Sequence, residues 1–428
     1  MEWLQVRDVL AGDGAGEKAC IRGWIHRKRQ SKKIAFLVVR DGTDVIQTTV
    51  RAGTEPFPEA EKVTIESSVE VEGTVHADAR APGGKELRVE KLRIIGLSDT
   101  FPITRDQSTE LLMDLRHLWV RSVPMNRVMR LRAAVFQASR EYFDTMGFVE
   151  VHPPMFITAA CEGGSTLFKV PYFGKKAYLT QSSQFYLEAL ITGLERVYCV
   201  APSFRAEKSR TTRHLTEFWH IEAEEAFCGL EGTMRTQEDL VAHICQTIAT
   251  RFPEELQAMG RDPEVIAGVK APFERISYDK SIDILQGRGV DIPWGADLGT
   301  KEERELTMEF EQPFFVYHYP AEAKAFYHRL DPEDSSKVLC ADMLAPEGHG
   351  EIVGGGERTW TIEEIMSRIN EEELDTTDYE WYLDLRRYGG VPHAGFGLGA
   401  ARLIKWICGM EHIRDALPFP RTMNRIYP

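Results

Sequence analysis

Long hydrophobic runs are missing from this 428-residue sequence, and their absence limits where the protein can work. No apolar stretch approaches the roughly 20 residues that a helix needs to cross a bilayer. Residues 1–12 also lack the apolar centre of a signal peptide. The seven cysteines are odd in number and have no CxxC spacing, which argues against a disulfide framework and a zinc site. We therefore expect a cytoplasmic protein without a membrane segment.

A surplus of positive charge is also missing. The formal net charge is −14 at pH 7, which excludes indiscriminate attraction to nucleic acids. Cations are instead concentrated between Arg22 and Arg40, where seven Lys and Arg residues occur without any Asp or Glu. A solvated hairpin is one interpretation of such a run. A local surface for a polyanion is the other.

The chain divides into two regions by its patterns. Up to about residue 96, short runs of alternating apolar and polar residues are separated by turn signals, as at residues 41–43, which predicts a small β-barrel. The remainder mixes helical patterns with short strands in no regular βαβ order, which predicts an antiparallel sheet flanked by helices. We therefore predict an α+β fold with domains at residues 1–100 and 123–428, joined by a hinge at residues 101–122.

Two segments carry dense chemistry. The first, FRAEKSRTTRHLTEFWHIEAE from Phe204 to Glu224, sets arginines, a histidine, an aromatic ring and carboxylates at short spacings. These groups suit a nucleoside triphosphate held beside an amino acid, although a solvated hairpin is the alternative because single motifs arise by chance. The second, HAGFGLGAARLIKWI at residues 393–407, places glycines before Arg402 and a helical apolar pattern. Glycines let the backbone approach a ligand, and a helix N-terminus favours phosphate.

Together these segments resemble motifs 2 and 3 of the class II aminoacyl-tRNA synthetases, most closely the asparaginyl and aspartyl branch. A predicted helix at about residues 126–146, followed by the strand FVEVHPPM, resembles motif 1, which forms the dimer interface in that family. Further segments extend the resemblance through most of the chain: RHL (116–118), EGGSTLF (162–168), TQSSQ (180–184), GEIVGG (350–355) and PFPR (418–421). The resemblance implies a homodimer of archaeal-type length, in which an N-terminal OB-fold reads the tRNA anticodon and a class II catalytic domain follows. The helical pattern at residues 230–259 is expected to be scaffold.

The implied reaction joins an amino acid to ATP as an adenylate and then transfers it to tRNA. Two anions must meet, which requires fixed cations. The resemblance implies Arg205 and Arg402 as catalytic residues, with Arg205 spanning the substrate carboxylate and the α-phosphate, and Phe218 stacking on adenine opposite Arg402. It assigns ATP binding to Arg205, Glu207, Arg213, His214, Phe218, Glu351 and Arg402. It places Mg²⁺ on Asp342 and Glu351, hard oxygen ligands that suit this ion, while a structural hydrogen-bonding role is the alternative for His214.

The choice between asparagine and aspartate depends on charge. Aspartyl enzymes have a lysine where this sequence has Leu187 and an aspartate where it has Glu222. A pocket with Arg358 and a carboxylate, but no second cation, favours a neutral carboxamide. Glu162 and Gln184 are expected to bind the α-ammonium. The resemblance thus implies activation of L-asparagine and its transfer to tRNA(Asn), and an unforeseen lysine beside the substrate side chain would contradict this choice.

The predicted barrel contains the expected tRNA contacts. The resemblance places Phe36 where a ring stacks on anticodon bases and Gln47 where an amide reads base edges. Arg27 and Arg29 belong to the basic segment beside them. Burial inside the barrel is the commoner fate of a phenylalanine, and without the resemblance Phe36 would not stand out from Phe57.

One position departs from the family pattern. Ala401 precedes Arg402, where the family has Glu or Asp, and loss of that carboxylate is expected to loosen the arginine. Three alternatives stay open: an aspartyl or non-discriminating synthetase, a synthetase-like asparagine synthetase, and a catalytically silent RNA-binding paralogue. Relatives of the asparagine synthetase type lack the anticodon barrel, which this sequence contains.

Overall fold

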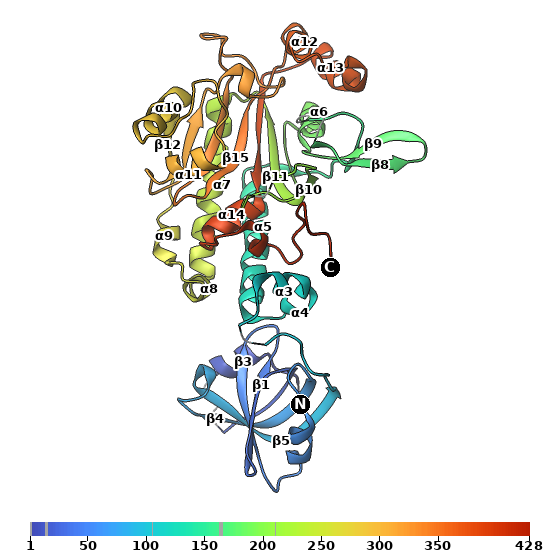
Figure 1. Cartoon of the computed structure of the whole chain (residues 1–428), viewed down its shortest axis with the longest axis vertical. Helices are drawn as coiled ribbons and strands as arrows, with labels where there is room; N and C mark the ends of the chain where they lie inside the picture. Colours follow the sequence, from blue (N-terminus) through green and yellow to red (C-terminus); the bar gives the residue numbers. More distant parts are fainter. Residues whose placement is uncertain (1, 13–15, 105, 162–165, 210) are drawn as a thin grey trace. The chain divides into compact units, whose positions relative to one another are not determined.

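The computed structural model describes residues 2–12, 16–104, 106–161, 166–209 and 211–428. The chain forms two compact units, Met1–Trp119 and Val120–Pro428, which are described separately (Figure 1). The first is a barrel and the second an α+β unit, so the predicted fold class is confirmed. The segment expected to act as a hinge contains two short helices, α3 (Thr109–Asp114) and α4 (Arg116–Trp119).

The first unit is a closed barrel with the strand order β1-β2-β3-β5-β4 (Figure 1). Its strands are β1 (Lys18–Gln30), β2 (Ile34–Arg40), β3 (Val45–Arg51), β4 (Ser68–Ala77) and β5 (Lys85–Gly96). Side chains alternate across a strand, and along β2 Ala35, Leu37 and Val39 are buried in the barrel core. Phe36 lies on the other face and is half-buried. Short helices α1 (Val6–Ala11), α2 (Phe57–Lys62) and η1 (Pro82–Gly84) complete the unit.

The second unit is built on an eight-stranded sheet with the order β12-β13-β14-β15-β16-β11-β10-β6. Its strands are β12 (Glu274–Ser277), β13 (Phe314–Tyr317), β14 (Cys340–Ala345), β15 (Gly350–Glu357), β16 (His393–Gly399), β11 (Glu217–Ala226), β10 (Arg196–Phe204) and β6 (Val149–Glu150). The pairings from β13 to β10 are antiparallel, as predicted, whereas the outermost pairings, β12 with β13 and β10 with β6, are parallel. The sheet is therefore mixed at its edges.

Helices cover this sheet and supply its core. Helix α7 (Leu230–Arg251) contacts β14, β15 and β16, and helix α5 (Val123–Thr145) packs against α7 (Figure 1). The predicted helical segment at 230–259 is two helices, because Pro253, which cannot continue a hydrogen-bonded turn, begins α8 (Pro253–Ala258). The other helices are α6 (Gln184–Leu194), α9 (Pro263–Ala267), α10 (Tyr278–Gly287), α11 (Thr300–Thr307), α12 (Ile362–Glu371), α13 (Glu380–Arg387) and α14 (Ala400–Ile407), with short turns η3 (Ala321–Ala323), η4 (Thr376–Tyr379) and η5 (Ile413–Ala416). A small sheet joins β7 (Phe156–Ile157), β9 (Lys175–Leu179) and β8 (Lys169–Tyr172).

Within the described ranges, no helix combines the length and apolarity required to cross a membrane. All seven cysteines are free thiols, and six of them are buried, where a thiol packs as a small hydrophobic group.

Candidate active site

The floor of the candidate site is one cross-strand row of the large sheet. Asp342 on β14 pairs with Gly354 on β15, Gly354 with Gly397 on β16, and Gly397 with Glu222 on β11. Paired residues point to the same face of a sheet, so two carboxylates stand on this face with only glycines between them. Three strand steps of about 4.8 Å separate the two acidic positions by about 14 Å. The row therefore forms an open floor with an acidic residue at each end.

The glycines on β16 result from the alternation in HAGFGLG. Phe396 and Leu398 are buried in the core beneath the sheet, so the intervening Gly395, Gly397 and Gly399 face the opposite side. A Cβ at Gly395 would clash with Glu224. Glycine here keeps the surface low enough for a ligand to lie on the backbone.

Above this floor lies a cavity of about 860 Å³. Its volume is in the range of sites for small ligands and cofactors. Predicted residues on its wall are Gln184, Leu187, Arg205, Glu222, Asp342, Glu351 and Arg358. A smaller hollow of about 70 Å³ contains Arg213, His214, Phe218 and Arg402. Arg205 and Glu351 line both spaces, so the two form one continuous site.

The smaller hollow is bounded by arginines that carboxylates hold in place. Arg402 Nη1 lies 2.9 Å from Glu351 Oε2 and donates to the Glu351 carbonyl oxygen at 3.3 Å. Arg213 Nη2 donates to Glu303 Oε1 at 2.6 Å, and Nη1 bonds the other Glu303 oxygen. Ala401 supplies no carboxylate, but Glu351 provides Arg402 with two contacts. The orientation of Arg402 is therefore fixed from the neighbouring strand β15.

The hairpin of β10 and β11 carries the remaining predicted ATP residues. Phe218 is half-buried, and its ring centre lies 5.9 Å from Cζ of Arg205. Ser209 Oγ lies 3.0 Å from Nδ1 of His214. Burial, reinforced by Arg402, lowers the pKa of His214, so a neutral ring faces the hollow. Glu207 is half-buried and does not line either space.

The predicted metal ligands converge above Gly354. A Cβ on Gly354 would lie 3.3 Å from Glu351 Oε1 and 3.4 Å from Asp342 Oδ1. The other oxygens are engaged, since Glu351 Oε2 pairs with Arg402 and Asp342 Oδ2 accepts a hydrogen bond from Lys324 Nζ at 2.6 Å. Two carboxylate oxygens facing one point are suitable donors for Mg²⁺.

The two acids differ in charge state. Burial raises the pKa of Asp342 to about 6, helped by Glu351 and opposed by Lys324. Burial also opposes ionisation of Glu351, but Arg402, Arg213 and Lys324 outweigh it and hold the pKa of Glu351 at about 2. Glu351 therefore stays ionised at neutral pH, whereas Asp342 gains a proton in mildly acidic solution.

Glu222 closes the opposite end of the floor. The backbone N–H of Ser183 donates to Glu222 Oε2 at 2.9 Å, and Ser182 Oγ bonds the other oxygen. Ser182 Oγ also accepts from the N–H of Gln184 at 3.1 Å. The QSSQ element therefore fixes the carboxylate that was predicted to read the substrate side chain.

Arg358 stands beside Glu222 on the cavity wall and is paired twice with a residue that was not predicted. Its Nε and Nη2 donate to the two oxygens of Glu224 at 3.1 and 3.2 Å. Both side chains are almost fully buried. A guanidinium has five N–H groups, so this pairing fixes the arginine and leaves donors for a ligand.

Leu187 is 1% exposed, packs with Ile191 and Val197, and lines the cavity. It is therefore a packing leucine, and it contributes no cation to the pocket. A lysine does line the cavity elsewhere, because Lys324 is bound to Asp342 at the other end of the floor. Glu162 lies outside the described residues.

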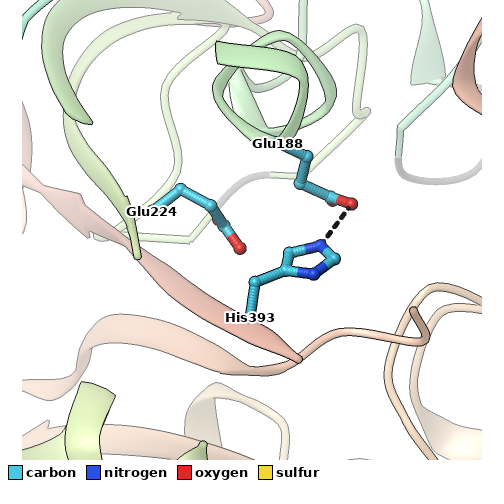
Figure 2. Close-up of side chains that lie close together, drawn as sticks. All are labelled: Glu188, Glu224 and His393. Carbon is cyan, nitrogen blue, oxygen red and sulfur yellow. Dashed lines mark hydrogen bonds and ion pairs between the residues drawn. The ribbon is translucent and has the colours of Figure 1, made fainter. Parts of the chain in front are cut away.

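Behind Gln184 lies a buried polar network. Gln184 Nε2 donates to Glu188 Oε1 at 2.9 Å, and Arg386 Nη2 donates to Glu188 Oε2 at 2.5 Å. Figure 2 shows Glu188 bonded to His393 Nε2, with Glu224 nearby. Among the described residues, Glu188, Glu224 and His393 are the one trio of possible metal ligands whose ligand atoms lie close enough to share an ion.

Charge pairing gives this trio a different role. Burial opposes ionisation of Glu188, but Arg386 and His393 outweigh it and hold its pKa below the ordinary value. Glu188 pairs with Arg386, and Glu224 pairs with Arg358. Each carboxylate already has a cation, so the network supports Gln184 and Arg358 structurally.

Comparisons with known proteins agree with this geometry. Residues 108–423 match the family model for class II tRNA synthetases (D, K and N), and residues 19–95 match that of the OB-fold nucleic acid binding domain. The chain is 51% identical to an asparagine–tRNA ligase of Thermococcus gammatolerans over 415 residues, 96% of each protein.

Solved structures extend the similarity to three dimensions. The asparaginyl-tRNA synthetase of Pyrococcus horikoshii, complexed with asparaginyl-adenylate, matches with a TM-score of 0.97 and 49% identity over 100% of both chains. The asparaginyl-tRNA synthetase of Entamoeba histolytica matches with a TM-score of 0.91 and 33% identity, again over 100% of both chains. The chain belongs to the class II tRNA synthetase family. The family predicted from the two motif segments is confirmed.

In this class II synthetase the predicted tRNA residues lie together on the outer face of the barrel. Arg29 pairs with Phe36, and Arg27 pairs with Val38, which in turn pairs with Gln47. These are adjacent rows on β1, β2 and β3, and alternate residues share a face. Arg27 and Arg29 are exposed, while Phe36 and Gln47 are half-buried. Phe57, by contrast, belongs to the barrel core.

Several residues of the synthetase site were missed from the sequence. Glu224 could have been found, because it lies two residues after Glu222 on the same strand and so on the same face. Lys324 and Glu303 gave no local signal, since they come from a turn and from helix α11. Their roles arise only from tertiary contacts with Asp342 and Arg213.

Proposed function

We propose that the chain is an asparagine–tRNA ligase that forms asparaginyl-adenylate from L-asparagine and ATP and transfers the amino acid to tRNA(Asn). The observation that carries this proposal is the composition of the pocket at the Glu222 end of the floor. Glu222 and Arg358 offer one acceptor and one donor, and Leu187 stands where a second cation would be required for aspartate. An amide matches this set because it has both a donor and an acceptor. The names of the relatives support the same choice.

The length of the floor suggests how the substrates lie. The asparagine side chain meets Glu222 and Arg358, with its α-ammonium near Gln184, and its α-carboxylate points along the glycines toward the phosphates. Arg205 lines both the cavity and the smaller hollow, so it is the cation that can touch the carboxylate and the α-phosphate at once. A carboxylate oxygen attacks the α-phosphorus, and the bond to the departing pyrophosphate breaks.

The smaller hollow is the proposed ATP site. Phe218 and Arg402 line it together, which suits an adenine held between a ring and a guanidinium. Arg213 and His214 lie on the same wall for the outer phosphates, with Glu207 nearby. Asp342 and Glu351 would hold Mg²⁺ through the oxygens that face Gly354. When bound, this ion neutralises phosphate charge.

The cation at the far end of the floor does not favour aspartate. Lys324 pairs with Asp342. Burial lowers the pKa of Lys324, but the Asp342 carboxylate outweighs this effect and raises that pKa above its ordinary value. Its charge is therefore matched, and about 14 Å of sheet separates the Asp342 and Glu222 positions. An aspartyl or non-discriminating activity thus gains no support from this lysine. Likewise, the contacts between Arg402 and Glu351 remove the main support for a silent paralogue.

The barrel face and the motif 1 region suggest the partners. Arg27, Arg29, Phe36 and Gln47 offer cations, a ring and an amide to an unpaired anticodon. Beyond α5, Val149, Met155 and Phe156 are each more than 40% exposed. Apolar patches of this kind mark interfaces, so we propose a homodimer through this surface. Buried free thiols are compatible with the cytoplasm.

Amino-acid-dependent ATP–pyrophosphate exchange tests the proposed function. The purified protein should exchange with L-asparagine, and aspartate should be the poorer substrate by kcat/KM. Aspartate as the better substrate would overturn the specificity, and exchange with neither amino acid would overturn the proposed activity. Light scattering of the same sample should give twice the mass of 48.6 kDa.

A further inference from the structure

His328 lines the main cavity, although neither the motifs nor the charge argument assigned it a role. It forms an antiparallel bridge with Arg358. Hydrogen bonds from Arg329 N to Glu357 O and from Thr359 N to Tyr327 O flank this pair. Such a non-hydrogen-bonded pair brings its two side chains especially close on one face. The imidazole of His328 is therefore the immediate neighbour of the arginine proposed to read the substrate side chain.

The two ring nitrogens of His328 have different surroundings. The side chain is 7% exposed, and Nδ1 is sealed from solvent without a hydrogen-bond partner among the described residues. Nε2 is not sealed, so it is the nitrogen at the cavity surface. A buried N–H without a hydrogen-bond partner is rarer than a buried acceptor without one. The proton of the neutral ring thus belongs on Nε2, which presents a donor to the cavity.

The ring is neutral because of its surroundings. Burial lowers the pKa of His328 well below its ordinary value, and Arg358, Lys324 and Arg368 reinforce this effect against Glu188. A neutral donor has a particular use beside Arg358. It adds a hydrogen bond without adding the positive charge that would attract a substrate carboxylate.

We propose that His328 is a substrate-binding residue, whose Nε2–H donates to the side-chain oxygen of L-asparagine alongside Arg358. This inference rests on the proposed function. A carbonyl oxygen has two lone pairs, so it accepts from the imidazole and the guanidinium together. The carboxamide NH₂ remains for Glu222. The side chain of asparagine is thereby held by two donors and one acceptor, with a single positive charge among them.

Two variants of matched length separate the hydrogen bond from packing. His328→Gln keeps an N–H near the position of Nε2, whereas His328→Met fills a similar volume without a donor. In pyrophosphate exchange we expect the Met variant to raise the KM for asparagine about tenfold, as for one lost hydrogen bond in a buried site. The Gln variant should stay within about threefold of the wild type. The KM for ATP should not change in either variant, because the contact is with the amino acid alone.

Thermal melting establishes that both variants fold, and His328→Leu replaces the Met variant if it does not. An unchanged asparagine KM without the donor would overturn the inference. Equal losses in the Gln and Met variants, or a loss confined to the KM for ATP, would also overturn it. The wild type keeps the two proposals apart. Asparagine exchange by the wild type with an unaffected Met variant rejects only the role of His328, whereas no exchange by the wild type rejects the proposed function as well.

Discussion

The cavity of the catalytic unit and the outer face of the barrel handle positive charge in opposite ways. In the cavity Arg358 pairs with Glu224, and in the smaller hollow that joins it Arg402 pairs with Glu351. On the barrel face, Arg27 and Arg29 are exposed and form no ion pair within the described ranges. A paired cation is held in one geometry, whereas an unpaired surface cation keeps its mobility and its counterions. The cavity is therefore suited to select one small molecule, and the barrel face to attract a polyanion.

This difference also explains how an acidic protein can bind tRNA. Ion pairing within the cavity neutralises its cations before any ligand arrives, so they contribute little long-range attraction. Counterion release requires cations that are free to meet phosphate. Within the basic segment, the exposed Arg27 and Arg29 supply such cations locally despite the net charge of −14.

The largest effect is expected from Arg205, a cation that lines both the cavity and the smaller hollow. Arg205→Ala should lower asparagine-dependent pyrophosphate exchange by roughly 10²–10³-fold, because it removes charge stabilisation during attack on the α-phosphate. Filter binding of tRNA should be almost unchanged, since the barrel is intact. The control is Arg235→Ala on the exposed side of α7. Exchange within about threefold of wild type in the Arg205 variant would break the contrast between the two regions.

Specificity should depend on the negative end of the floor. Glu222→Gln keeps the size but removes the charge, and a hydrogen bond to a charged group contributes about 1.5–3 kcal/mol. The preference for asparagine over aspartate, as a ratio of kcat/KM values, should therefore fall by roughly 10- to 100-fold. Asp239→Asn, an exposed change of the same charge on α7, should leave the ratio unaltered. A ratio unchanged by Glu222→Gln would refute the role of this carboxylate.

The barrel should show the reverse pattern. Phe36→Ala should weaken tRNA binding by about 1–3 kcal/mol, the contribution of stacking to one base, while amino-acid activation stays normal. Phe57→Ala is a revealing control, because this ring is in the barrel core and its loss should cost about 3–5 kcal/mol of stability. Equal losses of tRNA affinity and of melting temperature in the Phe36 variant would assign that ring to packing instead.

Lowering the pH should selectively weaken Mg²⁺ binding at the Asp342 end of the floor. Asp342 has a pKa raised to about 6 by burial, whereas the arginines hold that of Glu351 at about 2. As the pH falls below 6, Asp342 gains a proton and its ligand strength declines about tenfold per unit. The Mg²⁺ concentration needed for half-maximal exchange should rise accordingly between pH 6 and 5. A flat requirement over that interval would count against Asp342 as a ligand, and Asp342→Asn should show no such dependence.

The smallest effect concerns a single surface cation. Arg27→Gln should change tRNA affinity modestly, but the slope of log Kd against log salt should decrease by about 0.7, as for one phosphate contact on a single strand. Lys62→Gln, an exposed change at the end of α2, should leave the slope unaltered. An unchanged slope in the Arg27 variant would remove this residue from the tRNA surface.

Candidate site residues could be predicted from the sequence where side chains recur at the two-residue period of a strand. Phe218 and Glu222 follow the two-residue alternation of β11, and the glycines of β16 follow the same rule, so residues on one face could be selected from spacing. Glu224 lies on that face too, but it was missed. Motif 1 was less predictable. The expected strand after Gly147 is only Val149–Glu150, because its pairing with β10 is short.

Residues that depend on distant contacts could not be predicted. Lys324 lies in a turn with no regular pattern, and its position over Asp342 requires two remote segments to meet. His328 shows the same limit, because its importance comes from a bridge to Arg358 that is 30 residues away in sequence. Such roles arise from packing between elements, which local spacing does not record.

The glycine row between Glu222 and Asp342 has one more consequence. Strand spacing is nearly invariant, so the distance between the Glu222 end, proposed to bind the amide, and the Asp342 end, proposed to face the phosphates, is fixed by the sheet. Glutamine carries the same amide on a side chain longer by one methylene. If it contacted one end of the floor, its other polar group would extend past the position required at the opposite end. We therefore expect this synthetase to discriminate against glutamine by side-chain length, without a residue that blocks the pocket, and against aspartate by charge.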